Sequence, residues 1–167
     1  MIDARNLLTL RVLPGAINGL INGALAWMVQ GNATSVGLWT EGVYAIDLMV
    51  TGFLLPSISW LIVRPVMRKQ ASAGYGPDIA TLPSLWLRHC MPTSLWGGAL
   101  AIGTVGTLLG TVMVLVMQAL GGPSFSGTTY VAFKSGYSAL LAGILQPTLV
   151  FAALQSLMKP AARTSFP

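Results

Sequence analysis

The chain has 167 residues, of which 54% are hydrophobic and 8% are charged, and its mean hydropathy is +0.72. Soluble domains carry about a quarter charged residues, so this composition excludes a water-exposed globule and predicts an integral membrane protein in contact with the lipid bilayer. The net charge of +5 does not indicate nucleic-acid binding, because the nine Lys and Arg residues lie mostly at the ends of apolar segments. A single cysteine and a single histidine exclude an intrachain disulfide and a Cys/His zinc cluster, and we expect no metal and no cofactor.

Four apolar segments approach the length of about 20 residues that a helix needs to cross a bilayer core. We expect these spans at about 11–29, 42–63, 95–120 and 129–157. The first is interpreted as a retained span and not as a cleaved signal peptide, because two asparagines interrupt it and three more apolar segments follow. The sequence therefore predicts an all-α integral membrane four-helix bundle.

The spans divide the chain into three regions. We expect a first transmembrane hairpin over 1–69, a linker over 70–94 and a second transmembrane hairpin over 95–167. The linker contains a short apolar piece at 82–91, which either lies as a helix in the headgroup region or belongs to a solvated connection.

Small residues recur at every fourth position of the first span, as Gly15, Gly19 and Gly23, with Asn18 and Asn22 beside them. On a helix, residues three and four apart lie on the same face, so these five form one stripe. Glycine lets a second helix approach closely, and an asparagine inside the membrane needs a hydrogen-bond partner in place of water. We predict that this face packs against another helix.

The third span repeats the pattern with Gly106 and Gly110. Two small-residue faces exceed the needs of a single four-helix bundle, because glycine interfaces are typical of helices that associate inside the membrane. We therefore expect a homo-oligomer or docking on another membrane protein.

Charged residues mark the ends of the spans and predict the orientation. The second span is expected to stop at Arg64-Pro65, which is followed by Arg68 and Lys69. All but one of the nine Lys and Arg residues lie in the amino-terminal lead, in the central region or in the carboxy-terminal tail, the exception being Lys134. By the positive-inside rule, both termini and the central linker are expected in the cytoplasm.

The two hairpins share a short similarity. Residues 51–56 (TGFLLP) resemble residues 142–147 (AGILQP), and a cation-bearing end follows each. This leaves open two tandem hairpins related by an axis along the membrane normal, or a chance likeness of two membrane helices. The run from Pro56 to Lys69, with its Arg-Pro-x-x-Arg-Lys stop, resembles hairpins of small bacterial inner-membrane proteins of unknown function. That resemblance implies a bacterial inner membrane as the location.

Two charges lie inside the predicted spans, where charges are costly and often functional. Asp47 and Lys134 each lie about five residues from the outer end of a span, at matching depth and with opposite sign. They either form an ion pair that joins the hairpins, or remain apart with the lysine reaching the headgroups. Alternatively they form a titratable gate, in which protonation of Asp47 loosens the pair and a polar track continues inward through Thr51 and Ser138.

Asn18 and Asn22 offer a second polar set near the middle of the membrane. Their simplest role is hydrogen bonding between helices. The alternative is a solute site with Gln146 and Thr148 opposite, at which Pro56 and Pro147 free backbone carbonyls of their helices.

These patterns favour two classes of function. The first is a small channel or transporter for an ion or solute, working as an oligomer with the Asp47–Lys134 pair near its outer face. The second is a non-catalytic accessory or assembly subunit of a larger membrane complex, in which the glycine stripe would contact another chain. The chain contains no nucleotide-binding loop, nucleophile elbow or metalloprotease motif, and we do not expect an enzyme.

Overall fold

The structure is a computed structural model, and its described residues are 4–40, 42–72, 92 and 94–158. Within these residues the chain forms four long helices, α1 (Ala4–Gln30), α2 (Tyr44–Ser72), α4 (Leu95–Ala119) and α5 (Gly127–Met158). Each contains a stretch that is long and apolar enough to cross a membrane. The prediction of an all-helical protein with four such helices is confirmed. The apolar piece expected at 82–91 lies outside the described residues.

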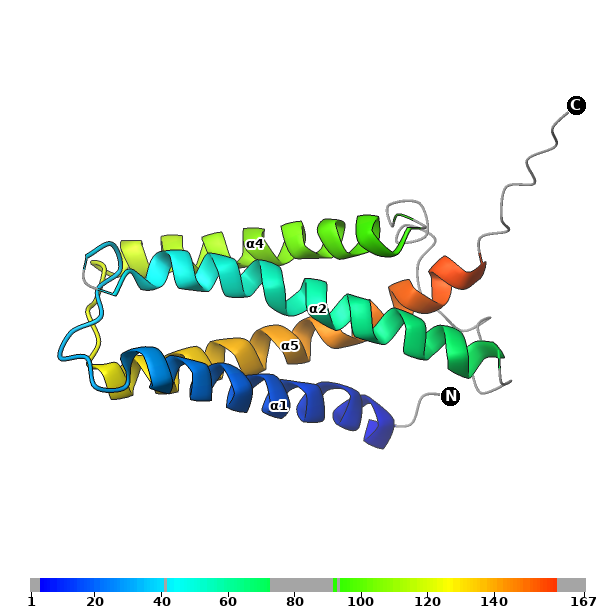
Figure 1. The fold of residues 1–167 in the computed structure, drawn as a ribbon, viewed down its shortest axis with the longest axis horizontal. Coiled ribbons are helices and arrows are strands. Elements are labelled where there is room, and N and C mark those ends of the chain that lie inside the picture. The colour runs from blue at the N-terminus through cyan, green and yellow to red at the C-terminus, as the bar shows by residue number, and fades with distance from the viewer. Residues whose placement is uncertain (1–3, 41, 73–91, 93, 159–167) are drawn as a thin grey trace, which may run out of the picture.

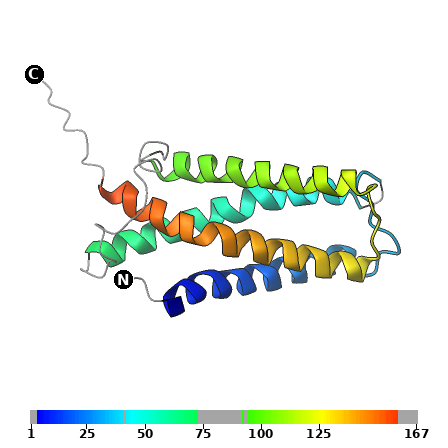
Figure 2. The same cartoon turned by 180° about the vertical axis from the view of Figure 1, so that it is seen from behind.

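The helices lie side by side in the order α1, α5, α2, α4 (Figure 1). α1 packs along α5, α4 packs along α2, and α2 packs on α5 in the middle. Viewed from behind, α5 passes in front of α2 (Figure 2). The two helices of each expected hairpin, α1 with α2 and α4 with α5, are therefore not packed along each other, because α5 lies between the first two and α2 lies between the last two.

The glycine stripe of α1 lies against α5 of the same chain. A Cβ added to Gly15 would lie 2.8 Å from the carbonyl oxygen of Ala139, and one added to Gly19 would lie 3.0 Å from the carbonyl oxygen of Ser135. The Ser135 hydroxyl donates a hydrogen bond of 2.6 Å to the carbonyl oxygen of Gly19. Any side chain larger than hydrogen at these glycines would push the two helices apart.

The contact between α2 and α4 has the same character. A Cβ added to Gly52 would lie 2.5 Å from the carbonyl oxygen of Gly106. Pro56 has no N–H to bond the carbonyl of Gly52 four residues earlier, and this carbonyl instead points at the bare backbone of Gly106. The Ser57 hydroxyl and the Trp60 indole N–H donate to carbonyl oxygens of α4, at 3.0 Å each.

α2 does not end where the sequence predicts. The helix continues through Pro65 and ends at Ser72. A proline inside a membrane helix costs one backbone hydrogen bond without stopping the helix when its surroundings satisfy the freed groups. The residues after Pro65 include Met, Arg, Lys, Gln and Ala, which are good helix formers and prolong the last turns.

The loops α1–α2 and α4–α5 meet at one end of the bundle. Val36 and Phe125 form an isolated antiparallel bridge with hydrogen bonds of 2.8 and 3.0 Å. The Tyr44 hydroxyl donates to the carbonyl oxygen of Pro123 at 2.8 Å, and the Tyr44 ring contacts the Phe125 ring. We call these joined loops the loop cap; its described residues are 31–40, 42–43 and 120–126.

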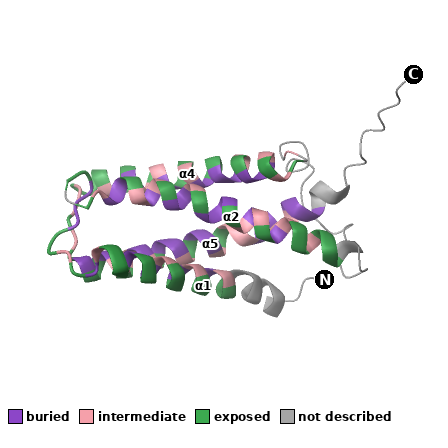
Figure 3. Ribbon diagram, in the orientation of Figure 1, coloured by how far each residue is buried: buried purple, intermediate pink, exposed green. Residues whose placement is uncertain are grey.

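Buried residues concentrate on the two central helices, whereas α1 and α4 expose large apolar side chains on their outer sides (Figure 3). An exposed apolar surface of this extent is unfavourable in water and suits contact with lipid tails. The burial pattern thus agrees with helices that stand in a bilayer.

Candidate functional site

A groove separates α1 from α2 on the face shown in Figure 1, with α5 behind it. It consists of two adjoining cavities of about 370 and 380 Å³, which share Asn22, Leu25, Thr51 and Leu54. Residues of α1 from Ile17 to Gln30, residues of α2 from Asp47 to Ile62, and Tyr130 and Lys134 of α5 bound it. We call it the α1–α2 groove.

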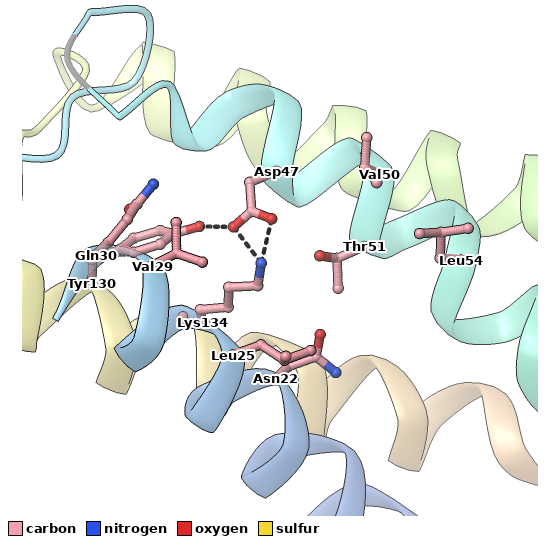
Figure 4. Close-up of a pocket in the computed structure, with 11 residues that line it drawn as sticks. Asn22, Leu25, Val29, Gln30, Asp47, Val50, Thr51, Leu54, Tyr130 and Lys134 are labelled. Carbon is pink, nitrogen blue, oxygen red and sulfur yellow. Dashed lines mark hydrogen bonds and ion pairs between the residues drawn. The ribbon is translucent and has the colours of Figure 1, made fainter.

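A charge cluster stands at the loop end of the groove (Figure 4). The Lys134 ammonium contacts both carboxylate oxygens of Asp47, and the Tyr130 hydroxyl donates a hydrogen bond to one of them. The lysine side chain is 8% exposed, whereas the aspartate side chain is 32% exposed. The pair therefore joins α2 to α5 and still presents its carboxylate to the groove.

Helix geometry explains why these three residues meet. Tyr130 and Lys134 are four residues apart on α5 and so project from the same face. Asp47 lies in the first turn of α2, where the free backbone N–H groups favour a negative charge. A third partner matters, because a largely buried ion pair is stable only when further hydrogen bonds satisfy its remaining polar atoms.

Several polar atoms in the groove have no hydrogen-bond partner among the described residues. Thr51 is 6% exposed and its hydroxyl makes no such bond, although the residue lines both cavities. The side-chain oxygen of Gln30 is buried and equally unpartnered. Figure 4 shows the Thr51 hydroxyl and the Asn22 amide in the space between α1 and α2. Polar groups without partners are costly at such places unless a ligand or water satisfies them.

The two asparagines do not link helices. The side-chain amide of Asn22 donates 3.0 Å to the carbonyl oxygen of Asn18, and that of Asn18 donates 2.9 Å to the carbonyl oxygen of Pro14. Both bonds stay within α1, so the amide oxygens are left without a protein partner in the described residues. Both residues line the groove.

The remaining predicted polar residues lie elsewhere. Ser138 is fully buried with an unpartnered hydroxyl, but it does not line the groove. Gln146 and Thr148 are likewise absent from the groove. Asn18, Asn22 and Thr51 thus line the same groove as the charge cluster, and the other three do not.

Sequence reasoning missed two residues of this site. Tyr130 lies one turn from Lys134 on the same helix face, and this spacing was the available signal. Gln30 ends α1 and donates a hydrogen bond of 3.0 Å to the carbonyl oxygen of Gly42, which ties the loop end of α1 to the start of α2. Nothing in the sequence around Gln30 indicates that contact.

The groove is closed at one end and open along its side. The Gln30–Gly42 hydrogen bond and the loop cap lie at the loop end, beyond the charge cluster. Away from that end the walls are mostly apolar, and side chains such as Leu25, Leu54 and Ile62 remain about half exposed. In the described part of the chain, no three His, Cys, Asp or Glu side chains gather as metal ligands.

Comparison of the chain with protein-family models, with curated proteins and with solved structures found no match. The class of protein therefore follows from the fold and the site alone. It is an integral membrane protein with four helices long and apolar enough to span the bilayer, and with an ion pair on the wall of a groove between two of them.

Proposed function

We propose that the protein is a small transporter for an ion or solute, with the α1–α2 groove as its path and the Asp47–Lys134 pair as its gate. The observation that carries this proposal is the exposure of the Asp47 carboxylate to a cavity lined by unpartnered polar atoms. An ion pair that only joined two helices would not need its carboxylate to face a cavity, whereas a gate has to be reached by the ion or solute.

The location and orientation belong to the same proposal. We propose a bacterial inner membrane, which the resemblance of the run from Pro56 to Lys69 implies, with both termini in the cytoplasm, as the distribution of Lys and Arg favours. The loop cap and the charge cluster then lie toward the outer side, and the groove leads from there toward the cytoplasm.

A repeat in the packing supports a duplicated hairpin. The same sequence interval separates Gly15 from Gly106, Gly19 from Gly110, and Pro56 from Pro147. Packing partners agree with it: Gly15 lies beside Gly143 as Gly106 lies beside Gly52, and the same interval separates those two partners. An axis along the bundle would exchange the α1–α5 contact with the α4–α2 contact.

Polar residues of the groove depart from this repeat. At the same interval from Asn18, Asn22 and Thr51, the second half of the chain has Leu109, Met113 and Ala142. Similar helix contacts therefore form without these polar side chains. Their presence in one half favours a role in binding over a role in packing.

The accessory-subunit alternative loses its main support. It expects the glycine stripe to contact another chain, whereas Gly15, Gly19 and Gly23 are buried against α5. The homo-oligomer remains a prediction, and its contacts would use apolar side chains that are exposed in the single chain. Native mass spectrometry in mild detergent measures that stoichiometry directly.

The transport proposal is tested by flux in proteoliposomes. A trapped pH indicator reports proton entry, and parallel vesicles report K⁺, Na⁺ and Cl⁻. We expect flux of one of these ions, and its loss in Asp47→Asn with the helical content retained. Thr104→Val is the matched control, because Thr104 is exposed on α4 and its hydroxyl donates only to its own helix, at the carbonyl of Leu100.

A second measurement tests water access to the groove without a known substrate. In a Cys90→Ser background, which removes the only cysteine, Thr51→Cys should react with a membrane-impermeant thiol reagent. Leu108→Cys, on the outer face of α4, should not react. Equal protection of both positions, or unfolding of Asp47→Asn without any flux in the wild type, would favour a purely structural ion pair.

A further inference from the structure

The groove has the shape and polarity of a site for an amphiphile. At ~1.5 Å per residue, the stretch from Ile17 to Gln30 is about 20 Å long, which exceeds half of the ~30 Å hydrocarbon core. Its two charges lie at the loop end, and beyond them leucine and isoleucine side chains form most of the walls, with Asn18 and Ser59 among them. The opening between α1 and α2 leads sideways to the position of the lipid tails.

The charge cluster determines which charges the polar end of a bound amphiphile has to carry. A ligand with a single charge would separate Asp47 from Lys134 and leave one of them unpaired at low dielectric, which is costly. A zwitterion avoids this cost, because its cation can pair with Asp47 while its anion pairs with Lys134. The site is therefore complementary in charge to a headgroup that carries both signs.

Polar atoms without a hydrogen-bond partner indicate which kind of cationic group the site would bind. The Gln30 side-chain oxygen and the Asn22 amide oxygen are acceptors that lack donors among the described residues. A primary ammonium offers three N–H donors and can satisfy the carboxylate together with one of these acceptors. A trimethylammonium group has no N–H and is bound by aromatic cages, whereas among the described residues Tyr130 is the single aromatic side chain that lines the groove. The hydroxyl of Thr51 and the ammonium of Lys134 remain as donors to an anion.

We infer that the α1–α2 groove binds one membrane phospholipid with a primary ammonium and a phosphate in its headgroup. The headgroup lies on Asp47 and Lys134, and an acyl chain lies along Leu25 and Leu54. This inference rests on the proposed role of the groove as a transport path, and it adds a way in which transport through the groove is regulated. A transported ion or solute has to displace the headgroup, so the lipid controls access to the pair.

Native mass spectrometry of the full-length protein tests the inference. The protein is equilibrated with phosphatidylethanolamine, phosphatidylcholine and phosphatidylglycerol that carry identical acyl chains. We expect one retained phosphatidylethanolamine per chain, enriched about tenfold over each of the other lipids, as the difference of one charge-assisted hydrogen bond permits. The enrichment should disappear in Asp47→Asn/Lys134→Met, which removes both charges.

Because that double variant changes the ion pair that joins two helices, a second variant keeps the test independent of folding. Leu54→Trp fills the groove without touching a charge, and we expect it to lose the retained lipid. Leu108→Trp places the same side chain on the outer face of α4, where Leu108 is 61% exposed, and should retain the lipid.

Four results would overturn the inference. They are equal retention of the three lipids, equal behaviour of the two tryptophan variants, displacement of the lipid by soluble phosphoethanolamine, and a dimer that carries no lipid. Flux is measured separately, so the two proposals fail independently. Flux without lipid selectivity would reject the inference alone, and selective lipid binding without any flux would reject the transport proposal alone.

Discussion

The Asp47–Lys134 pair has unequal surroundings on its two sides, and this inequality governs the effect of each substitution. Removing the carboxylate leaves an ammonium that is almost fully buried and has no other acidic partner in the described structure. Removing the ammonium leaves a carboxylate that still accepts a hydrogen bond from Tyr130 and is partly exposed. Loss of one partner of a buried pair costs about 3 kcal/mol or more when the remaining charge stays unpaired.

We therefore predict an order of destabilisation. Asp47→Asn should lower the free energy of unfolding by about 3 kcal/mol, Lys134→Met by less, and the double variant by less than Asp47→Asn alone. Unfolding midpoints in detergent, followed by the fluorescence of the five tryptophans, measure this order. Single losses that simply add in the double variant would show that the two charges do not interact.

The charged residues of this site can be predicted from the sequence, but Tyr130 cannot. Asp47 and Lys134 stand out because charges are rare in membrane spans, and their matched depth follows from helix rise. Tyr130 does not stand out, because a tyrosine near a helix end is ordinary in a membrane protein. The four-residue spacing from Lys134 places Ser138 on the same face of α5, but it does not decide which neighbouring helix that face contacts.

At the scale of the helices, glycine decides how closely two backbones approach. Gly106 faces the backbone of α2, where an added Cβ would collide with the carbonyl of Gly52. Gly136 on α5 is exposed. Apart from its chain neighbours and the nearby backbone of α5, no atom of the described residues lies within 4 Å of a Cβ added there. The two positions thus separate the effect of packing from the effect of helix propensity.

We predict that Gly106→Ala lowers the unfolding midpoint, because the methyl group forces α4 away from α2. Gly136→Ala should leave the midpoint unchanged or raise it, since alanine is favoured over glycine in a helix by up to ~1 kcal/mol. Thermal unfolding of both variants in the same detergent makes the comparison. Equal midpoints would mean that α2 and α4 can shift at little cost.

The small-residue faces of α1 and α4 predict close packing, but they do not indicate which helix packs against each of them. Glycine specifies only that a backbone comes near, and any helix with a compatible surface satisfies it. A short turn would have favoured packing of α1 on α2, whereas the connection from Gly31 to Val43 is long enough for α5 to stand between them. The order of the helices therefore depended on contacts far apart in the sequence.

At the scale of the whole molecule, the loop cap marks one side of the bundle. Ser35 and Ser124 are exposed in the two loops, and Gln70 is exposed at the opposite end of α2. We predict that cysteines at Ser35 and Ser124, in the Cys90→Ser background, react with an impermeant maleimide on intact bacterial cells. A cysteine at Gln70 should react only after permeabilisation. The reverse result would invert the proposed orientation.

The contact between α1 and α5 also has a consequence for biogenesis. Membrane proteins insert their helices in the order of synthesis, and α1 is made before α2, α4 and its own packing partner α5. Until residues beyond Gly127 have left the ribosome, the stripe of Gly15, Gly19 and Gly23 faces lipid or a foreign helix. The nascent chain is thus most prone to wrong pairing in that interval, and an insertion chaperone that shields α1 would act there.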